Sequence, residues 1–210
     1  AFLVWGLLEL YEADFELAHL ETAVELNNDM LRLFWDEDAG GLYLYGDDAE
    51  SLVARPRELY DGALPSANSV ACHNLLRLSH ITASPELEEK AYNLLESCGG
   101  NVKARPAAFT HLLSAADFAL GPTREIVISG RRDDPNTEKL IDVVREHFLP
   151  RSVVLFLPRE EDRDRLESVF GWTPEEGDRE QPIVYICEDK VCEKPISDPD
   201  ELADTLDQSE

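Results

Sequence analysis

The stretch ELYDGALPSANSVACHNLL, residues 58–76, joins a polar turn directly to an apolar helix. Its first half is rich in Gly, Pro, Ser and Asn, and its second half has apolar residues at helical spacing. Gly62 and Pro65 shape a turn, and the hydroxyl of Ser66 or Ser69 can cap the helix that follows. The pattern therefore predicts a helix from about residue 66 to residue 81.

Helical spacing continues on both sides of this stretch. Apolar residues recur at helical spacing over residues 16–35, and the N-terminal residues before them are apolar on most faces of a helix. A fourth helix should open at Ser84 and end before Gly99, and a fifth should cover about residues 106–119. Five helices with short connections are typical of antiparallel hairpins. We therefore expect residues 1–120 to form an all-helical domain.

The pattern changes after Gly121. Residues 125–129 and 153–157 are short apolar runs rich in β-branched residues, and the segment between them has helical period. This order predicts a βαβ unit, whose two strands are parallel. A charged helix over residues 160–170, a third strand ending in a hairpin through residues 188–190, and a last helix capped by Asp198 should follow. Residues 123–210 are thus expected to be a small, three-stranded α/β domain.

The charge is strongly acidic, with 44 Asp and Glu against 19 Lys and Arg and a net charge of −25. Nucleic acids and anionic membranes need clustered cations, so neither is expected as a partner. Acid-rich, lysine-poor composition favours a halophilic protein, and an acidic interaction domain from an ordinary cell is the alternative. The sequence has no charged-then-apolar leader and no apolar run long enough to span a bilayer, so we expect a cytoplasmic location.

Four cysteines are too few for a disulfide scaffold in a chain of this size. Cys187 and Cys192 have a spacing that can suit a metal or a redox pair, but a zinc site needs two further ligands nearby. We expect these two cysteines to be reduced and to face each other across a small hairpin. No metal and no cofactor are expected. Cys72 and Cys98 are expected to pack between helices.

The polar turn has two open interpretations. It can be ordinary punctuation before a helix, or it can be the rim of a ligand site whose donors and acceptors suit a hydroxyl-rich molecule. The sugar-site interpretation requires that the polar groups of the turn open into a hollow between helix ends. Trp35 could add stacking to that rim, although core packing at a helix end is its simpler explanation. The candidate ligand-binding residues are Trp35, Asp36, Arg55, Arg57, Glu58, Tyr60, Asp61, Ser66, Asn68 and Ser69.

Catalytic residues remain unassigned by the sequence. With 44 acidic residues, a pair of carboxyl groups suited to glycoside hydrolysis is bound to occur and is therefore uninformative. His73 is the histidine nearest to the candidate rim, but a packed helix histidine is a better interpretation of it than a general base.

Residues 34–78, FWDEDAGGLYLYGDDAESLVARPRELYDGALPSANSVACHNLLRL, resemble the helical part of the spermatogenesis-associated protein 20 family, whose bacterial members include YyaL. Residues 183–206, with Cys-x4-Cys before Pro and Ser-Asp-Pro, resemble the end of the same family. The chain departs from the family pattern at Ala67, where Gly is usual, and at Arg57, where Lys is common. The thioredoxin-like domain of the family is not in these residues, so its redox activity is not carried over.

The resemblance implies a longer protein with a thioredoxin-like domain, a six-hairpin (α/α)6 toroid similar to N-acylglucosamine 2-epimerases and related glycosidases, and a small α/β tail. Residues 1–120 would then be the C-terminal portion of the toroid. Loops on one rim of such toroids line a cleft that binds sugars, which implies a carbohydrate-related function with an epimerase- or glycosidase-like cleft. The alternative is a non-enzymatic scaffold or interaction module that serves the thioredoxin-like domain.

The expected partners follow from the same resemblance. They are a carbohydrate ligand and the N-terminal part of the longer protein. Five helices cannot close a six-hairpin ring, so apolar faces around Trp5 and Leu75 would be left open. We therefore expect the isolated chain to form a homodimer.

Stability at different salt concentrations separates the two interpretations of the charge. For a halophilic chain, the free energy of unfolding in urea should rise between about 0.1 M and about 1 M KCl, because the Debye length falls from about 10 Å to about 3 Å. A free energy of unfolding that stays level or falls over this range would favour the acidic interaction domain instead.

Overall fold

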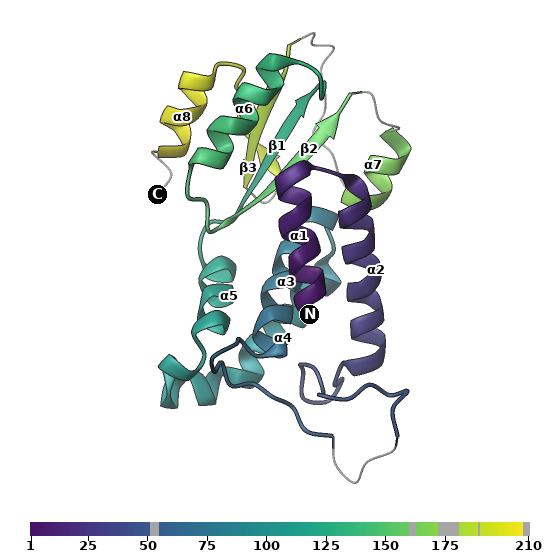
Figure 1. Ribbon diagram of the computed structural model, residues 1–210. Helices are drawn as coiled ribbons and strands as arrows, with labels where there is room; N and C mark the ends of the chain where they lie inside the picture. The colour runs from purple at the N-terminus through teal and green to yellow at the C-terminus, as the bar shows by residue number, and fades with distance from the viewer. Residues whose placement is uncertain (51–54, 160–162, 172–180, 189, 208–210) are drawn as a thin grey trace. The chain divides into compact units, whose positions relative to one another are not determined.

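The computed structural model describes residues 1–50, 55–159, 163–171, 181–188 and 190–207. The chain divides into two compact units, Ala1–Leu120 and Gly121–Glu210. The first unit is helical, and the second combines helices with a small sheet (Figure 1). The mainly helical fold with a small α/β unit is confirmed, whereas closure of the helices into an (α/α)6 toroid stays a prediction.

The first unit opens with an antiparallel hairpin of α1 (Phe2–Asp14) and α2 (Leu17–Phe34). Phe15 ends α1 in a left-handed conformation, with φ of 57°, and its N–H donates to the carbonyl of Tyr11. This short turn reverses the chain, so α2 packs back along α1. The helix expected over residues 16–35 is therefore confirmed.

The central helix of this unit is α3 (Ala67–Thr82), which packs against α1, α4 (Pro85–Ala104) and α5 (Thr110–Leu120). A helix with neighbours on three sides must be apolar or small on most of its faces. Twelve of its residues are accordingly buried, among them Leu75 and Leu78. The expectation that an apolar face around Leu75 is left open is therefore wrong, because α3 packs against three other helices of the same unit. The start and end of α3 agree with the sequence to within one residue.

The expected end of α4 before Gly99 is wrong, because α4 continues through Gly99 and Gly100 to Ala104. Burial of Leu94 and Cys98 on one face of α4 outweighs the low helix propensity of two glycines on the other. A Cβ on either glycine would meet nothing within 4 Å. Beyond α4, the helix expected over residues 106–119 divides into a 3₁₀ turn, Pro106–Ala108, and α5.

The second unit contains a four-stranded sheet in the order β2-β1-β3-β4. β1 (Arg124–Gly130) is parallel to β2 (Ser152–Pro158), and α6 (Pro135–Glu146) connects them, so the predicted βαβ unit is confirmed. β3 (Ile183–Glu188) is antiparallel to β1 and to β4 (Val191–Cys192). The fourth strand corrects the expectation of three, because the residues after the hairpin turn also pair with β3.

The described part of this unit has two further helices. α8 (Pro199–Asp207) packs beside α6, as Figure 1 shows. The Asp198 carboxylate accepts hydrogen bonds from the N–H groups of Asp200 and Glu201, so the predicted cap is confirmed. α7 (Arg163–Phe170) follows β2, and residues 160–162 of the predicted helix lie outside the described residues.

The hairpin after β3 corrects the expected oxidation state of its two cysteines. Cys187 and Cys192 form a disulfide, whereas the sequence led us to expect thiols. They lie opposite each other at a non-hydrogen-bonded position of the β3–β4 ladder, where the Cα atoms of paired strands come closest. Their Cα atoms are 3.9 Å apart, so the sulfur atoms are within bonding reach. The prediction that the two cysteines face each other across a hairpin is confirmed. Asp189, in the turn of this hairpin, lies outside the described residues.

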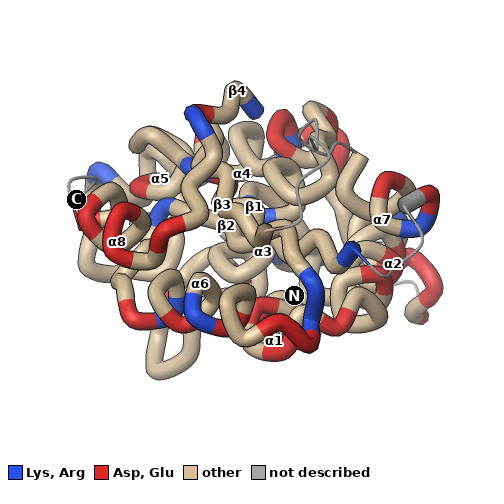
Figure 2. The backbone as a smooth tube through the Cα atoms, turned by 90° about the horizontal axis from the view of Figure 1, so that it is seen from above, with Lys and Arg blue, Asp and Glu red and all other residues tan. Residues whose placement is uncertain are grey.

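The acidic residues lie along the helices of both units, including α2 and α8 (Figure 2). Arg77, by contrast, is a buried charged residue. The side chain of Arg77 is 7% exposed and pairs with Glu9 at 2.6 Å and with Glu12 at 2.9 Å, which fastens α3 to α1. In the described part of the chain, no helix combines the length and apolar character that crossing a membrane requires.

Replacement of both helical glycines should stabilise the first unit. Because Gly99 and Gly100 lie inside α4 with room for a Cβ, the double substitution Gly99→Ala/Gly100→Ala should raise the free energy of unfolding by about 1–2 kcal/mol. Gly41→Ala is the matched control, since Gly41 has φ of +95° and its Cβ would lie 2.9 Å from Asn68 Oδ1. Urea denaturation should show opposite changes, and stabilisation by all three replacements would contradict this account.

Candidate functional site

The ten candidate ligand-binding residues fall into three classes of exposure. Trp35, Arg55 and Arg57 are half-buried, and Glu58 and Tyr60 are exposed. The remaining five polar residues are buried: Asp36, Asp61, Ser66, Asn68 and Ser69. A buried polar group must find hydrogen-bond partners inside the protein, so the partners of these five show what the motif does.

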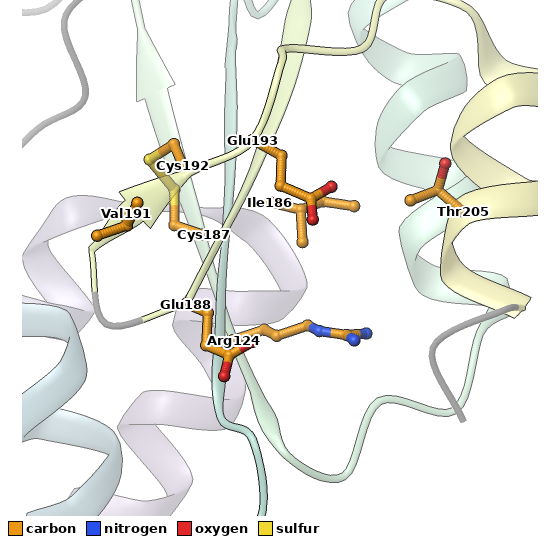
Figure 3. A pocket seen from close by; sticks show the side chains of 8 residues that line it. All are labelled: Arg124, Ile186, Cys187, Glu188, Val191, Cys192, Glu193 and Thr205. Carbon is orange, nitrogen blue, oxygen red and sulfur yellow. A yellow bond between two sulfur atoms is a disulfide. The ribbon is translucent and has the colours of Figure 1, made fainter.

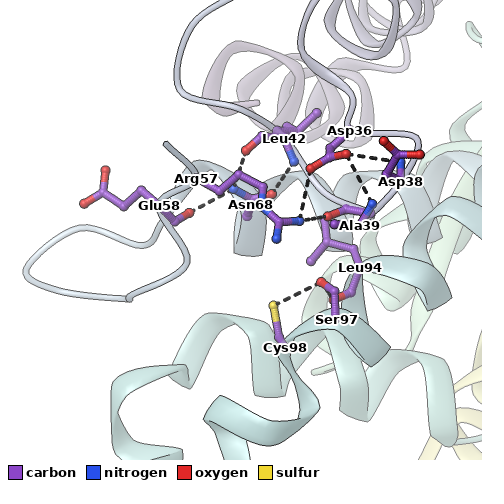
Figure 4. Close-up of polar contacts among 11 residues, drawn as sticks. Asp36, Asp38, Ala39, Leu42, Arg57, Glu58, Asn68, Leu94, Ser97 and Cys98 are labelled. Carbon is purple, nitrogen blue, oxygen red and sulfur yellow. Dashed lines mark hydrogen bonds and ion pairs between the residues drawn. The ribbon is translucent and has the colours of Figure 1, made fainter. Parts of the chain in front are cut away.

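Asn68 joins two segments of the α2–α3 connection to the first turn of α3 (Figure 4). Its Oδ1 accepts a hydrogen bond from the N–H of Leu42 at 2.6 Å, and its Nδ2 donates to the carbonyls of Leu42 at 3.0 Å and Glu58 at 2.8 Å. The side chain of Asn68 therefore pairs backbone groups that would otherwise be buried without partners. Gly41 allows this approach, because a side chain there would collide with Asn68 Oδ1.

Asp36 organises the tight loop that follows α2. Its Oδ1 accepts hydrogen bonds from the N–H groups of Asp38 and Ala39, and its Oδ2 lies 3.6 Å from Arg57. Burial by itself would raise the pKa of Asp36, but hydrogen bonds from the Tyr43 hydroxyl and the two N–H groups, with the charge of Arg57, hold the pKa below its usual value. Asp36 is therefore a charged anchor of the loop.

Asp61 connects the beginnings of α3 and α5. One carboxylate oxygen accepts a hydrogen bond from the N–H of Ser66 at 2.8 Å, and the other accepts from the N–H groups of His111 at 2.9 Å and Leu112 at 3.2 Å. A negative charge at two helix N-termini is favourable, because the first N–H groups of a helix have no intrahelical partner. Ser66 caps α3 by accepting from the N–H of Ser69, which decides between the two capping hydroxyls that the sequence allowed.

The arginines of the segment also make contacts within the protein. Arg55 pairs with Asp47, donates to the carbonyl of Tyr45 at 2.8 Å, and lies 4.1 Å from the centre of the Tyr43 ring. Arg57 donates to the carbonyl of Gly40. The buried part of the motif is thus explained by hydrogen bonds that hold the connection to the helix ends, and a ligand-binding role of the ten residues stays a prediction.

A pocket of about 460 Å³ lies beside the loop that this network holds in place. The loop and α4 supply its walls, and Trp35 is the candidate residue among its lining residues. Gly40 brings the loop close to α4, since a Cβ on it would lie 3.1 Å from the carbonyl of Asn93. Arg57 and Asn68 therefore act on this pocket through the loop. The lining residues are Trp35, Glu37, Asp38, Ala39, Gly40, Glu86, Glu89, Lys90, Asn93, Glu96 and Ser97.

The pocket combines one aromatic ring with many carboxylates. Lys90 Nζ lies 4.9 Å from the centre of the Trp35 ring and 3.6 Å from Glu37 Oε1. The sequence did not lead us to the α4 residues of the pocket, because we sought the site in the turn before α3 and not on α4. Their spacing of three and four residues over positions 86–97 places them on one face of α4, and this polar stripe is the signal that could have found them.

His73 belongs to an aromatic cluster and not to this pocket. Its ring centre lies 5.7 Å from that of His111 and 5.5 Å from that of Phe118. Burial, with the charges of Arg77 and His111, lowers the pKa of His73 to about 4, although Glu9 acts in the opposite direction. The neutral, packed histidine that the sequence favoured agrees with this geometry. Among the described residues, no three His, Cys, Asp or Glu side chains gather as metal ligands.

Removal of the Asn68 side chain tests the anchoring network. Asn68→Ala should lower the free energy of unfolding by about 3 kcal/mol, because it removes the partners of two buried backbone groups of Leu42 and of the part-buried carbonyl of Glu58. Tyr60→Ala, in the same connection at a side chain that is 60% exposed, should change it by less than about 0.5 kcal/mol. Urea denaturation measures both values, and an Asn68→Ala variant as stable as Tyr60→Ala would refute the anchoring role.

The comparisons with known proteins agree with the resemblance noted in the sequence. No family model matches the chain. The chain is 34% identical over 209 residues to human spermatogenesis-associated protein 20 and 33% identical over 211 residues to the rat protein, which covers 98% and 99% of this chain. It is also 29% identical over 206 residues to the uncharacterized protein B0495.5 of Caenorhabditis elegans. The matches cover 26–27% of these relatives, so the chain spans about a quarter of their length. On this similarity along almost all of its residues, the chain belongs to the spermatogenesis-associated protein 20 family.

Proposed function

We propose that the helical unit binds a small carbohydrate in the pocket beside Trp35. The observation that carries the proposal is the meeting of an indole ring with several carboxylates around about 460 Å³ of space. Carboxylate oxygens accept hydrogen bonds from sugar hydroxyls, and an aromatic face packs against the apolar face of a sugar ring. The volume is in the range of pockets for small ligands.

The charge of the pocket selects among sugars. Five of its lining residues are acidic, Glu37, Asp38, Glu86, Glu89 and Glu96, and one is a lysine. A carboxylated or phosphorylated sugar would be repelled by this charge, whereas neutral sugars and amino sugars would not. Lys90 already covers the Trp35 ring, so a protonated amino sugar can replace its ammonium group there. We therefore infer a preference for amino sugars over neutral sugars, and for neutral sugars over acidic ones.

Sugar titrations with two neighbouring variants test this proposal. Saturation-transfer NMR at about 10 mM sugar should give a stronger signal for glucosamine than for glucose and no signal for glucuronate. Glu89→Gln, which changes a pocket residue, should weaken glucosamine binding about threefold to tenfold. Glu88→Gln is the matched control, since Glu88 is exposed on the same helix and does not line the pocket.

The outcomes separate the proposal from its alternatives. No signal from any of the three sugars, or equal weakening by Glu88→Gln and Glu89→Gln, would rule out this pocket as a sugar site. If Trp35→Ala loses glucosamine binding but keeps glucose binding, the indole ring contributes only to the binding of the cationic group.

A second candidate function, as a scaffold within a longer protein, is favoured by the outer face of α1. Phe2, Leu3 and Leu10 are 44%, 65% and 50% exposed, and with Gly6 they form one stripe along the helix. An exposed apolar stripe of this kind suits packing against another protein surface. Amide exchange that no sugar alters near Trp35, together with protection of α1 by a protein partner, would favour the scaffold over the sugar site.

A further inference from the structure

The disulfide between Cys187 and Cys192 closes a very small loop. It joins β3 to β4 across a turn, and only four residues lie between the two cysteines. The stabilisation that a disulfide gives by restricting the unfolded chain grows with the length of the loop it closes. This disulfide is therefore expected to stabilise the folded chain less than a disulfide that closes a long loop.

The hairpin is already held by non-covalent bonds. The β3–β4 ladder pairs Cys187 with Cys192 and Glu188 with Val191, and the N–H of Lys190 donates to Glu125 Oε2 at 3.2 Å. Glu125 is fully buried on β1, directly opposite Cys187 in the sheet register. Glu125, Cys187 and Cys192 thus form one row across three strands, on the same face of the sheet. This row keeps the cysteines facing each other whether or not they are bonded.

The two cysteines of the pair differ in how far they are exposed. Cys187 is 1% exposed, whereas Cys192 is half-buried on a two-residue edge strand beside Val191, which is 75% exposed. Figure 3 shows the disulfide at the edge of the hairpin, where both cysteines contribute to a pocket of about 280 Å³. Exposed disulfides are the ones that exchange with other thiols, because the attacking thiolate must reach a sulfur atom.

We propose that Cys187 and Cys192 are a thiol–disulfide exchange site whose substrate is a dithiol, such as a pair of cysteines on another polypeptide. One thiolate of the dithiol attacks Sγ of Cys192, the bond between the two cysteines breaks, and Cys187 leaves as a thiolate that takes a proton from water. The second thiolate of the dithiol then attacks the substrate sulfur bound to Cys192, and Cys192 leaves and is protonated. The dithiol becomes a disulfide, and the chain gains two electrons and two protons.

The division of roles follows from the two exposures. Cys192 is the sulfur that forms the mixed disulfide, and Cys187 is the resolving sulfur. Glu125 is a positioning residue, because its carboxylate holds the turn through Lys190 and so keeps Cys187 opposite Cys192 after reduction. This site belongs to the second unit and does not use the Trp35 pocket.

Single-cysteine variants of the full chain test the assignment. With oxidised glutathione as the probe, Cys187→Ser should form a mixed disulfide at Cys192 at least about tenfold faster than Cys192→Ser does at Cys187, as measured by intact mass. The buried thiols Cys72 and Cys98 are internal controls and should stay unmodified in both folded variants. Equal rates at the two positions, or faster reaction at Cys187, would overturn the proposal.

Reduction of the unaltered chain gives a second, independent test. In mixtures of reduced and oxidised dithiothreitol, the disulfide should open and re-form while the far-UV circular dichroism stays unchanged. A disulfide that opens only when urea unfolds the chain would show a structural bond and would overturn the exchange site.

Glu125 variants then test positioning. Glu125→Gln keeps an oxygen that can accept from Lys190 and should keep the reoxidation rate, whereas Glu125→Ala should slow reoxidation severalfold. Equal reoxidation rates in the two variants would remove the positioning role of Glu125. If Glu125→Ala does not fold, Glu125→Gln still tests the positioning role. Because this variant keeps the acceptor for the Lys190 N–H, slow reoxidation in it would contradict positioning through this hydrogen bond.

Discussion

The helical unit depends on the hydrogen bonds that Asn68 makes to the backbone of the connection before it. That connection leaves α2, turns sharply at Gly40 and Gly41, and passes over the start of α3. The N–H and the carbonyl of buried Leu42 need partners there, and Leu42 belongs to no helix or strand that could supply them. Asn68 pairs with Leu42 and Glu58, so one amide side chain replaces a missing stretch of secondary structure.

Asp61 has the corresponding task at the other end of the same turn. Its two oxygens accept from the first N–H groups of α3 and α5, which fixes the spacing between two helix starts. Asp36 and Arg57 then fix the loop that walls the Trp35 pocket. The motif that suggested a ligand rim is therefore largely a clamp, and the pocket that it shapes faces α4. The proposed sugar site depends on this clamp for its form and on α4 for most of its polar groups.

The acidic composition is compatible with both proposed sites for different reasons. In the helical unit, carboxylates surround the Trp35 pocket and exclude anionic ligands from it. In the second unit, the proposed exchange site needs no net charge, because it relies on the greater exposure of Cys192 and on the position of Cys187 directly opposite it. The two proposals therefore assign separate chemistry to the two units. The α1 stripe is a third surface, suited to contact with another part of a longer protein.

The amino-acid sequence by itself determined where most helices lie, the parallel βαβ unit, a serine cap at the start of α3 and the cap at Asp198, because these depend on neighbours a few residues away. The sequence also pointed to the family, because the motifs that carry the resemblance are continuous stretches of the chain. Tertiary structure alone decided the rest. The partners of Asn68 lie up to 26 residues away, packing carried α4 through Gly99, and strand register brought two cysteines close enough to bond. These outcomes depend on which surfaces meet in space, and local spacing carries no information about that.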